Sequence, residues 1–132
     1  MKDIKAISKY NTTVTDEEIE NGLMDDSGGI YSPDGKRLLQ MSLFGINSKS
    51  SYTVKDGTEV ICDDAFMGCI SLKSIVLPNS VTTIGDNAFE GCKSLQSITL
   101  SNSLTSIGNV AFAGCKSLQN IVLPDSVISL ED

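Results

Sequence analysis

Apolar residues recur along the second half of the chain with a period of 23 residues. Three blocks align without a gap: Ile61 to Thr83, Ile84 to Ser106 and Ile107 to Ser129. A unit this short cannot enclose a core by itself, so its inward side chains must pack on those of the neighbouring units. We therefore predict a stack of coils whose inward rows are the shared apolar positions. These rows are Ile61/Ile84/Ile107, Ala65/Ala88/Ala111, Phe66/Phe89/Phe112, Cys69/Cys92/Cys115, Leu72/Leu95/Leu118, Ile75/Ile98/Ile121, Leu77/Leu100/Leu123 and Val81/Leu104/Val127.

Each block predicts one clear strand. Within Leu-x-x-Ile-x-Leu the apolar positions alternate with a period of two, which is typical of a strand with one buried face. Pro78 and Pro124 end that strand in two of the blocks, and Val-x-x-Ile then carries the chain back. Asp63, Asp86 and Asn109 follow, and we predict that each caps a short helical or 3₁₀ turn.

A degenerate unit precedes the three blocks. Residues 51–61 align with residues 74–84, which places a degenerate coil between about Leu38 and Val60. We therefore divide the chain into residues 1–60, which hold an N-terminal tail, a cap and this degenerate repeat, and residues 61–132, which hold three tandem repeats.

The first coil needs a cap, because its apolar face and its unpaired strand groups would otherwise meet water. Ser32 to Lys36 is a turn signal between the apolar runs 29–31 and 37–39, which predicts a β-hairpin. Upstream, Thr15 to Glu18 fits a capping box that opens a short helix through about Asn21. The hairpin and the helix together predict an N-terminal cap.

The repeated motif carries a family resemblance. Leu-x-x-Ile-x-Leu-Pro-x-Ser-Val-x-x-Ile-Gly-x-x-Ala-Phe-x-Gly-Cys, as in Leu72 to Cys92, resembles the BspA-like leucine-rich repeat family. Residues 29–39 and 52–57 are similar to that family's capping segment. The resemblance implies a leucine-rich-repeat solenoid, an α/β repeat of mostly short parallel strands with a hairpin-and-helix cap. It also implies a bacterial surface or secreted protein that is associated with adhesion and with binding of host proteins. The chain departs from the pattern at Ser101, where the other blocks have proline, and at Cys62, where they have glycine.

Composition and charge exclude several classes of function. The chain has 132 residues, a formal net charge of -7 and no His. Without His there is no Ser-His-Asp or Cys-His catalysis and no imidazole metal site, so we expect no enzyme activity and no cofactor. No basic stripe is present, and nucleic acid and anionic membranes are therefore poor partners. Charges interrupt every apolar stretch of residues 1–10, so we predict no signal peptide in this chain and no membrane insertion.

Neither the cysteines nor the carboxylates predict a metal site. Cys69, Cys92 and Cys115 fall on one inward row, where reduced thiols act as small apolar fillers. A ladder spacing of roughly 5 Å leaves a disulfide open, although parallel Cβ vectors argue against one. Cys62, outside this row, is the candidate for greater exposure, and three thiols in a straight ladder offer no tetrahedral zinc site. Residues 25–29 lack the acidic spacing of an EF-hand, so we expect a solvated turn there.

The outward positions of the predicted strands form one continuous face. This face is small, neutral and rich in hydroxyl groups, and it lacks the Tyr, Trp and Arg anchors of tight interfaces, so we expect modest affinity. Its residues are Ser74, Val76, Ser97, Thr99, Asn120 and Val122, extended by Ser51 and Thr53, with Lys73, Gln96 and Gln119 just before the strands.

Two classes of function stay open at this point. The family resemblance favours a surface module whose strand face binds a host or extracellular-matrix protein. The alternative is a structural or self-associating repeat protein without a specific ligand, in which an uncapped C-terminal coil forms a homodimer through Val127 and Leu130.

Overall fold

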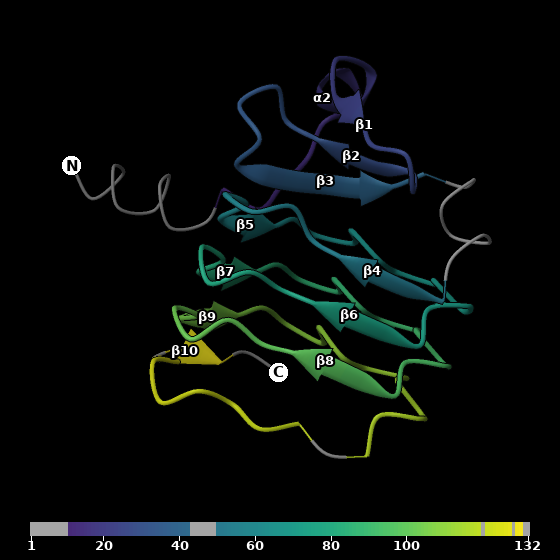
Figure 1. The fold of residues 1–132 in the computed structure, drawn as a ribbon, viewed down its shortest axis with the longest axis vertical. Helices are drawn as coiled ribbons and strands as arrows, with labels where there is room; N and C mark the ends of the chain where they lie inside the picture. Colours follow the sequence, from purple (N-terminus) through teal and green to yellow (C-terminus); the bar gives the residue numbers. More distant parts are fainter. Residues whose placement is uncertain (1–10, 43–49, 120, 128, 131–132) are drawn as a thin grey trace.

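The protein is a stack of coils beneath a small N-terminal cap (Figure 1). The computed structural model describes residues 11–42, 50–119 and 121–127, and the backbone of 129–130. Its elements are α2 (Asp16–Glu20), β1 (Leu23–Met24), β2 (Gly29–Tyr31), β3 (Arg37–Met41), β4 (Ser51–Thr53), β5 (Val60–Ile61), β6 (Ser74–Val76), β7 (Thr83–Ile84), β8 (Ser97–Thr99), β9 (Ser106–Ile107) and β10 (Ser129–Leu130). They form a seven-stranded sheet in the order β1-β2-β3-β5-β7-β9-β10 and a three-stranded sheet in the order β4-β6-β8.

The three-stranded sheet has the register that the repeat predicts. Its strands are parallel, and Ser51 pairs with Ser74, which pairs with Ser97. The degenerate unit therefore aligns with the first full block as expected. Tyr52 and Ile75 are buried at the middle of their strands, whereas the residues on either side face outward.

The return segment of each coil forms a second ladder of strands. β5, β7, β9 and β10 are only two residues long each, and they pair in parallel one coil above the next. Ser101, which replaces a proline between the two sheets, is fully buried. Its hydroxyl donates to the carbonyl of Val81 at 2.6 Å and accepts the N–H of Ser103 at 2.9 Å, so the turn keeps its shape without proline.

The segment after each short strand is a run of turns, so the expected helix cap is wrong, although the bonds within the segment have the i→i−3 spacing of the 3₁₀ alternative. The N–H groups of Ala65 and Met67 bond within the segment, to Cys62 and Asp64, whereas that of Phe66 bonds to Ala88 of the next coil. Because alternate N–H groups are used between coils, an α-helical ladder cannot form.

The expected capping residues bond to the next coil instead. Asp63 Oδ1 accepts the N–H of Asp86, and Asp86 Oδ1 accepts the N–H of Asn109, both at 2.8 Å. Asp64 and Asn87 take φ angles of 62° and 58°, a left-handed conformation that Asp and Asn tolerate.

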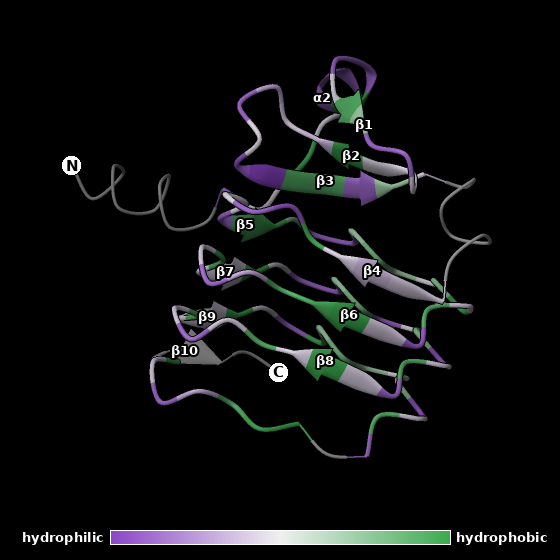
Figure 2. Cartoon of the chain, viewed as in Figure 1, coloured by the Kyte–Doolittle hydropathy of each residue, from purple (hydrophilic) through white to green (hydrophobic). Residues whose placement is uncertain are grey.

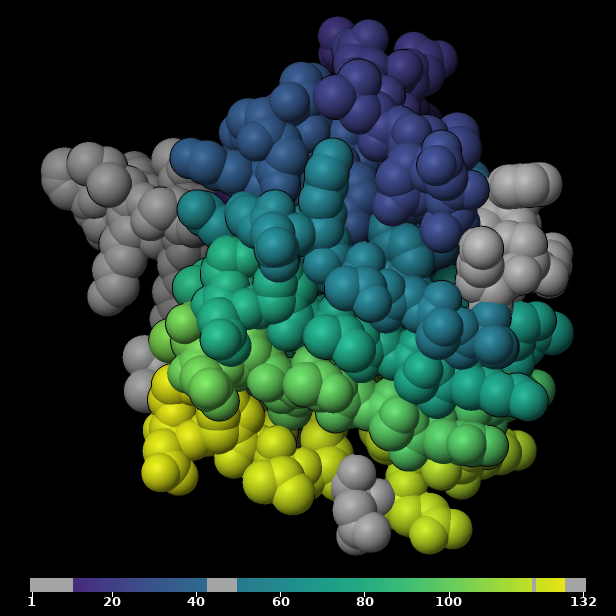
Figure 3. Space-filling model, in the orientation of Figure 1, coloured from purple at the N-terminus to yellow at the C-terminus, as the bar shows by residue number. Residues whose placement is uncertain are grey.

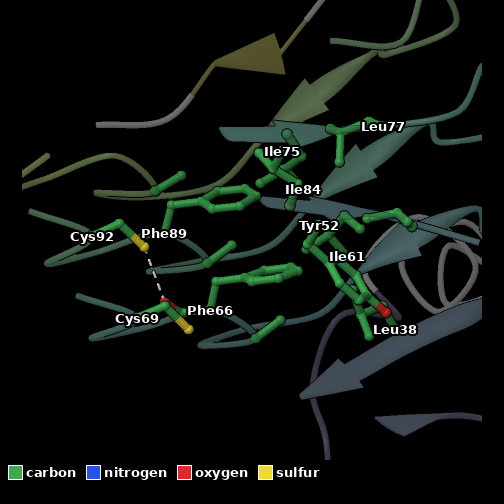
Figure 4. Packing of buried hydrophobic residues seen from close by; sticks show 14 of the residues in the cluster. Leu38, Tyr52, Ile61, Phe66, Cys69, Ile75, Leu77, Ile84, Phe89 and Cys92 are labelled. Carbon is green, nitrogen blue, oxygen red and sulfur yellow. Dashed lines mark hydrogen bonds between the residues drawn. The ribbon is translucent and has the colours of Figure 1, made fainter. Parts of the chain in front are cut away.

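The inward rows build one continuous core. Phe66 and Phe89 are fully buried, and their rings stack with centroids 5.0 Å apart (Figure 4). Phe112 continues the stack at 5.3 Å from Phe89 but is only half-buried.

The last coil departs further from the predicted inward pattern. Ile121 and Leu123 were expected inside, but they are 38% and 36% exposed. The described residues pack against this coil from one side, so its side chains lack the second neighbour that buries the equivalent Ile75 and Leu77.

The N-terminal cap matches its sequence prediction. Thr15 and Glu18 form a complete capping box at the start of α2, and β2 and β3 form the antiparallel hairpin. β3 then pairs in parallel with β5, which joins the cap to the first coil. None of the described helices is long and apolar enough to cross a membrane.

All four cysteines are free thiols. Cys92 donates its thiol hydrogen to the carbonyl of Phe66 at 3.1 Å, which ties two coils together inside the core (Figure 4). The expected exposure of Cys62 is wrong, because Cys62 is fully buried in a small cluster with Ile30 and Leu39. Burial raises the pKa of Cys62 to about 11, so this thiol is protonated at neutral pH.

Candidate interaction surface

The outward side of the three-stranded sheet is an uncharged face, which we call the strand face. It consists of the outward residues of β4, β6 and β8, which Figure 2 draws pale or green rather than deep purple. Its serine row is Ser51, Ser74 and Ser97, and its second row is Thr53, Val76 and Thr99. Ser74 is partly exposed, and the other five are exposed, Val76 to 42%. Alternation along each strand places these groups outward because the central residue points into the core.

The structure brings together most, but not all, of the predicted face. Val122 belongs to the last coil and is 85% exposed, although residues 121–123 are not paired as a strand. Asn120 lies outside the described residues. The strand face is therefore well defined across β4, β6 and β8 and continues to Val122.

A polar depression lies at the start of the strands. It has a volume of about 590 Å³ and is lined by Gln96, Lys116, Ser117 and Gln119. The strand pattern predicts Gln96 and Gln119 beside the strand face but not Lys116 and Ser117, because these two residues precede the pattern. The recurring Cys-Lys-Ser of two blocks was the signal that could have found them.

Val127 and Leu130, which are predicted to self-associate, lie in the last coil. Val127 is half-buried and packs against the main core. The backbone of Leu130 pairs with Ile107 of the previous coil, in β10. The more exposed apolar side chains of this coil are those of Ile121, Val122 and Leu123.

A chain of hydrogen bonds joins the cap to the first coil. The N–H of Lys55 donates to the Tyr31 hydroxyl at 3.1 Å, and Tyr31 donates to Tyr52 at 2.6 Å. Tyr52 donates to Asp25 Oδ2 at 2.6 Å, and a Cβ at Gly29 would collide with the Tyr52 hydroxyl. Burial raises the pKa of both tyrosines, so they remain protonated and hold the two parts together.

The turn at residues 25–29 forms as predicted, but it is not merely solvated. Asp25 Oδ1 accepts the N–H groups of Ser27 and Gly29, while its other oxygen binds Tyr52. Both carboxylate oxygens are therefore used within the protein. Among the described residues, no group of three or more His, Cys, Asp or Glu side chains is placed to hold a metal ion.

A second, smaller cavity of about 220 Å³ lies in the cap. Two of its charged groups are paired with each other, since Arg37 Nη1 lies 2.6 Å from Glu18 Oε2. The N–H of Thr15 and the guanidinium of Arg37 both donate to the Glu18 carboxylate and lower its pKa, and the Thr15 bond contributes more. The cavity is lined by Glu17, Glu18, Asn21, Ser32, Pro33, Arg37 and Leu39.

Stacked coils with two parallel ladders and a continuous apolar core define a leucine-rich-repeat solenoid. The sequence model of the BspA type leucine rich repeat region matches residues 39–132 with 6 copies. The chain belongs to this BspA type leucine-rich repeat family. No curated protein matches it.

Solved structures of similar proteins share the fold. The pneumococcal vaccine antigen PcpA superposes with a TM-score of 0.78 at 27% identity, over 84% of this chain and 27% of that one. A leucine rich cell surface protein of Faecalibacterium prausnitzii gives 0.77 at 29% identity, over 86% and 30%. A T. pallidum leucine rich repeat protein gives 0.61 at 33% identity, over 86% and 51%. The chain thus spans between about a quarter and a half of the length of these structures.

Proposed function

We propose that this chain is a protein-binding module of an adhesion-type cell-surface protein, and that the strand face contacts the partner. The observation that carries the proposal is the in-register, exposed and uncharged face of β4, β6 and β8. A partner that covers this face displaces water without leaving a charge buried and unpaired. The partner class is a host or extracellular-matrix protein.

The similar structures support the surface location. One of them is named a cell surface protein and another a vaccine antigen. The scaffold also suits binding, because a core that holds each strand on its neighbours keeps the face rigid before the partner arrives. The face lacks Trp, Tyr and Arg, so we expect its affinity for one partner to be modest.

Binding is a better explanation of this surface than catalysis. The described tyrosine hydroxyls at the cap are protonated and bonded to one another, and the buried Cys62 and Cys69 thiols have pKa values raised to about 11 by burial. None of these groups lies on the strand face, and serine or threonine hydroxyls without a base are poor nucleophiles.

The experiment measures binding of the purified chain to a panel of extracellular-matrix and serum proteins by biolayer interferometry. The test variant is Val76→Asp/Thr99→Asp, which places two charges at the centre of the strand face. The control is Asn79→Asp/Asn102→Asp, which adds the same charge at exposed positions outside the strands. We expect saturable binding that the test variant loses and the control keeps. Binding to no panel protein would contradict the proposal, as would equal binding by the unmodified chain, the test variant and the control.

Self-association is the second candidate, and the exposed apolar segment of the last coil favours it. Val122 is 85% exposed between Ile121 and Leu123, which are themselves more than a third exposed. Three neighbouring apolar side chains beyond the edge strand β8 can pack against those of a second copy. Light scattering at increasing concentration should then show a dimer that Val122→Lys abolishes. A monomeric mass throughout would remove this candidate.

A further inference from the structure

Lysines gather at one edge of the strand face, which we call the lysine edge. Residues 61–132 contain three basic residues, and all three belong to it: Lys73, Lys93 and Lys116. Each lies in the segment that leads into an outward strand or its equivalent. Lys73 directly precedes β6, at the repeat position that Gln96 and Gln119 occupy in the later coils. Lys93 and Lys116 share a different repeat position, slightly earlier in the segment.

Hydrogen bonds to backbone carbonyls stack these segments on one another. The N–H of Gln96 donates to the carbonyl of Lys73 at 2.8 Å, so Gln96 lies one coil below Lys73. The hydroxyl of Ser117 donates to the carbonyl of Lys93 at 2.7 Å, which joins the next two coils in the same way. The lysine edge is therefore continuous across coils, and the polar depression of about 590 Å³ opens beside Lys116.

The charges of the lysine edge are not neutralised within the described part of the chain. All three lysines are exposed, and no described carboxylate lies within 4.0 Å of any of their ammonium groups. Arg37 of the cap shows the contrast, since it is paired with Glu18 at 2.6 Å. Unpaired positive charges grouped on a chain of net charge -7 attract negatively charged groups of a partner.

The surroundings of the lysine edge indicate what kind of acidic partner fits. The amide groups of Gln96 and Gln119 both donate and accept hydrogen bonds, as peptide groups require. The strand face next to them presents the exposed aliphatic side chains of Val76 and Val122. Carboxylates beside aliphatic side chains are a feature of a polypeptide, whereas an acidic polysaccharide presents hydroxyl-bearing rings to the two valines.

We propose that the lysine edge binds an acidic polypeptide segment of the partner, with its carboxylates on Lys73, Lys93 and Lys116 and an aliphatic side chain against the strand face. This inference rests on the proposed function and deepens it by assigning the chemistry of the partner. The amides of the depression then bond to the backbone of the segment.

The test uses a fluorescein-labelled peptide of alternating Glu and Val, with fluorescence anisotropy as the readout. The test variant is Lys93→Gln/Lys116→Gln, and the matched control is Lys36→Gln/Lys55→Gln, which removes two exposed lysines elsewhere. Exposed ion pairs contribute little each, so we expect binding roughly fivefold weaker in the test variant and changed less than about twofold in the control. Binding should also weaken between about 50 mM and about 500 mM NaCl. Thermal unfolding of each variant shows that the fold is kept.

Several results would overturn the inference. One is that Lys93→Gln/Lys116→Gln binds the peptide as tightly as the unmodified chain does. Another is that the control loses as much binding as the test variant, which would indicate that the peptide is attracted to any positive charge. Tighter binding of polygalacturonate than of the peptide would assign the edge to an acidic polysaccharide. If a panel protein needs Val76 and Thr99 but not the lysines, only this inference fails. If no panel protein binds, the proposed function fails.

Discussion

At the scale of single residues, the phenylalanine stack carries much of the packing. Phe89 lies between two rings, 5.0 Å from Phe66 and 5.3 Å from Phe112, and has no exposed surface. Phe112 has one described ring neighbour and remains half-buried. The same residue type at the same repeat position therefore differs in how much apolar surface it removes from water.

Replacement of these two rings should have unequal effects. Phe89→Ala leaves a cavity between two coils and should lower the free energy of unfolding by about 3–5 kcal/mol, whereas Phe112→Ala should cost roughly half as much. Urea unfolding followed by circular dichroism measures both values. Equal losses would show that the last coil is as tightly packed as the middle of the stack.

Asp63 gives a prediction about pH. Burial raises the pKa of its carboxyl group, and the N–H of Asp86 offsets this only in part. The folded protein therefore holds this proton more tightly than the unfolded chain does. The contribution to stability is complete below the ordinary pKa of about 4 and is lost as the pH rises through the raised value.

Asp63→Asn should therefore stabilise the protein at pH values near neutrality and change little in acid. The amide oxygen can still accept the N–H of Asp86, and Asn109 already stands at this repeat position. Thermal unfolding at about pH 3.5 and about pH 7 checks this, with Asp64→Asn at the exposed neighbouring position as the control. A lower melting temperature of Asp63→Asn at neutral pH would mean that the ionised carboxylate binds the N–H strongly enough to outweigh burial.

At the scale of elements, Arg37 fastens the N-terminal segment to the hairpin. Its guanidinium donates to the carbonyls of Asn11 and Thr13 and to Glu18 of α2. The same segment is joined to the first coil where the N–H of Asp63 bonds to the carbonyl of Thr12 at 2.8 Å. One side chain of β3 thus positions residues on both sides of the start of α2.

Arg37→Met should release this segment while leaving the coils in place. Bonds to a charged group contribute about 1.5–3 kcal/mol, so amide hydrogens of residues 12–21 should exchange at least roughly tenfold faster. Hydrogen exchange with mass spectrometry reads this out, and Lys36→Met at the exposed neighbouring position is the control. Unchanged exchange in residues 12–21 would show that apolar contacts of Val14 and Ile19 hold the segment by themselves.

The elements differ in how far the sequence predicts them. The hairpin and the capping box depend on local turn residues, and the strand register depends on the 23-residue repeat, so all three follow from the sequence. The turns after Asp63 do not, because their conformation depends on N–H groups that bond to another coil. The two-residue strands of the second ladder are too short to show any period. Strand alternation likewise predicts that Val76 and Thr99 are exposed. It does not predict that Lys116 lines the polar depression, because that position depends on how the turns stack on one another.

At the scale of the whole molecule, the coils form successive bands down the stack (Figure 3), and the described strands of each coil pair with those of the adjacent coils. In such stacks stability is approximately a sum of the stability of each unit and of its contacts with adjacent units. The cap covers the first coil, while the last coil keeps exposed apolar side chains at residues 121–123. Stability should therefore decline from the middle of the stack toward the last coil.

Hydrogen exchange of matched amides tests this gradient. The N–H groups of Gly85 and Gly108 make the same bond one coil apart, each 2.8 Å from the carbonyl of an isoleucine in the coil above. We expect Gly108 to exchange faster, because its coil includes the half-buried Phe112 and Leu118. Equal rates would indicate that the stack opens only as one cooperative unit.

Nuclear magnetic resonance locates a binding surface residue by residue and therefore tests whether a partner protein binds the strand face. Backbone amide spectra are recorded with and without the panel protein that shows saturable binding. If the partner binds the strand face, the shifted signals belong to β4, β6 and β8 and to the segments that lead into them. Shifts confined to β5, β7 and β9, or to the last coil, would contradict it, as would a panel that contains no partner.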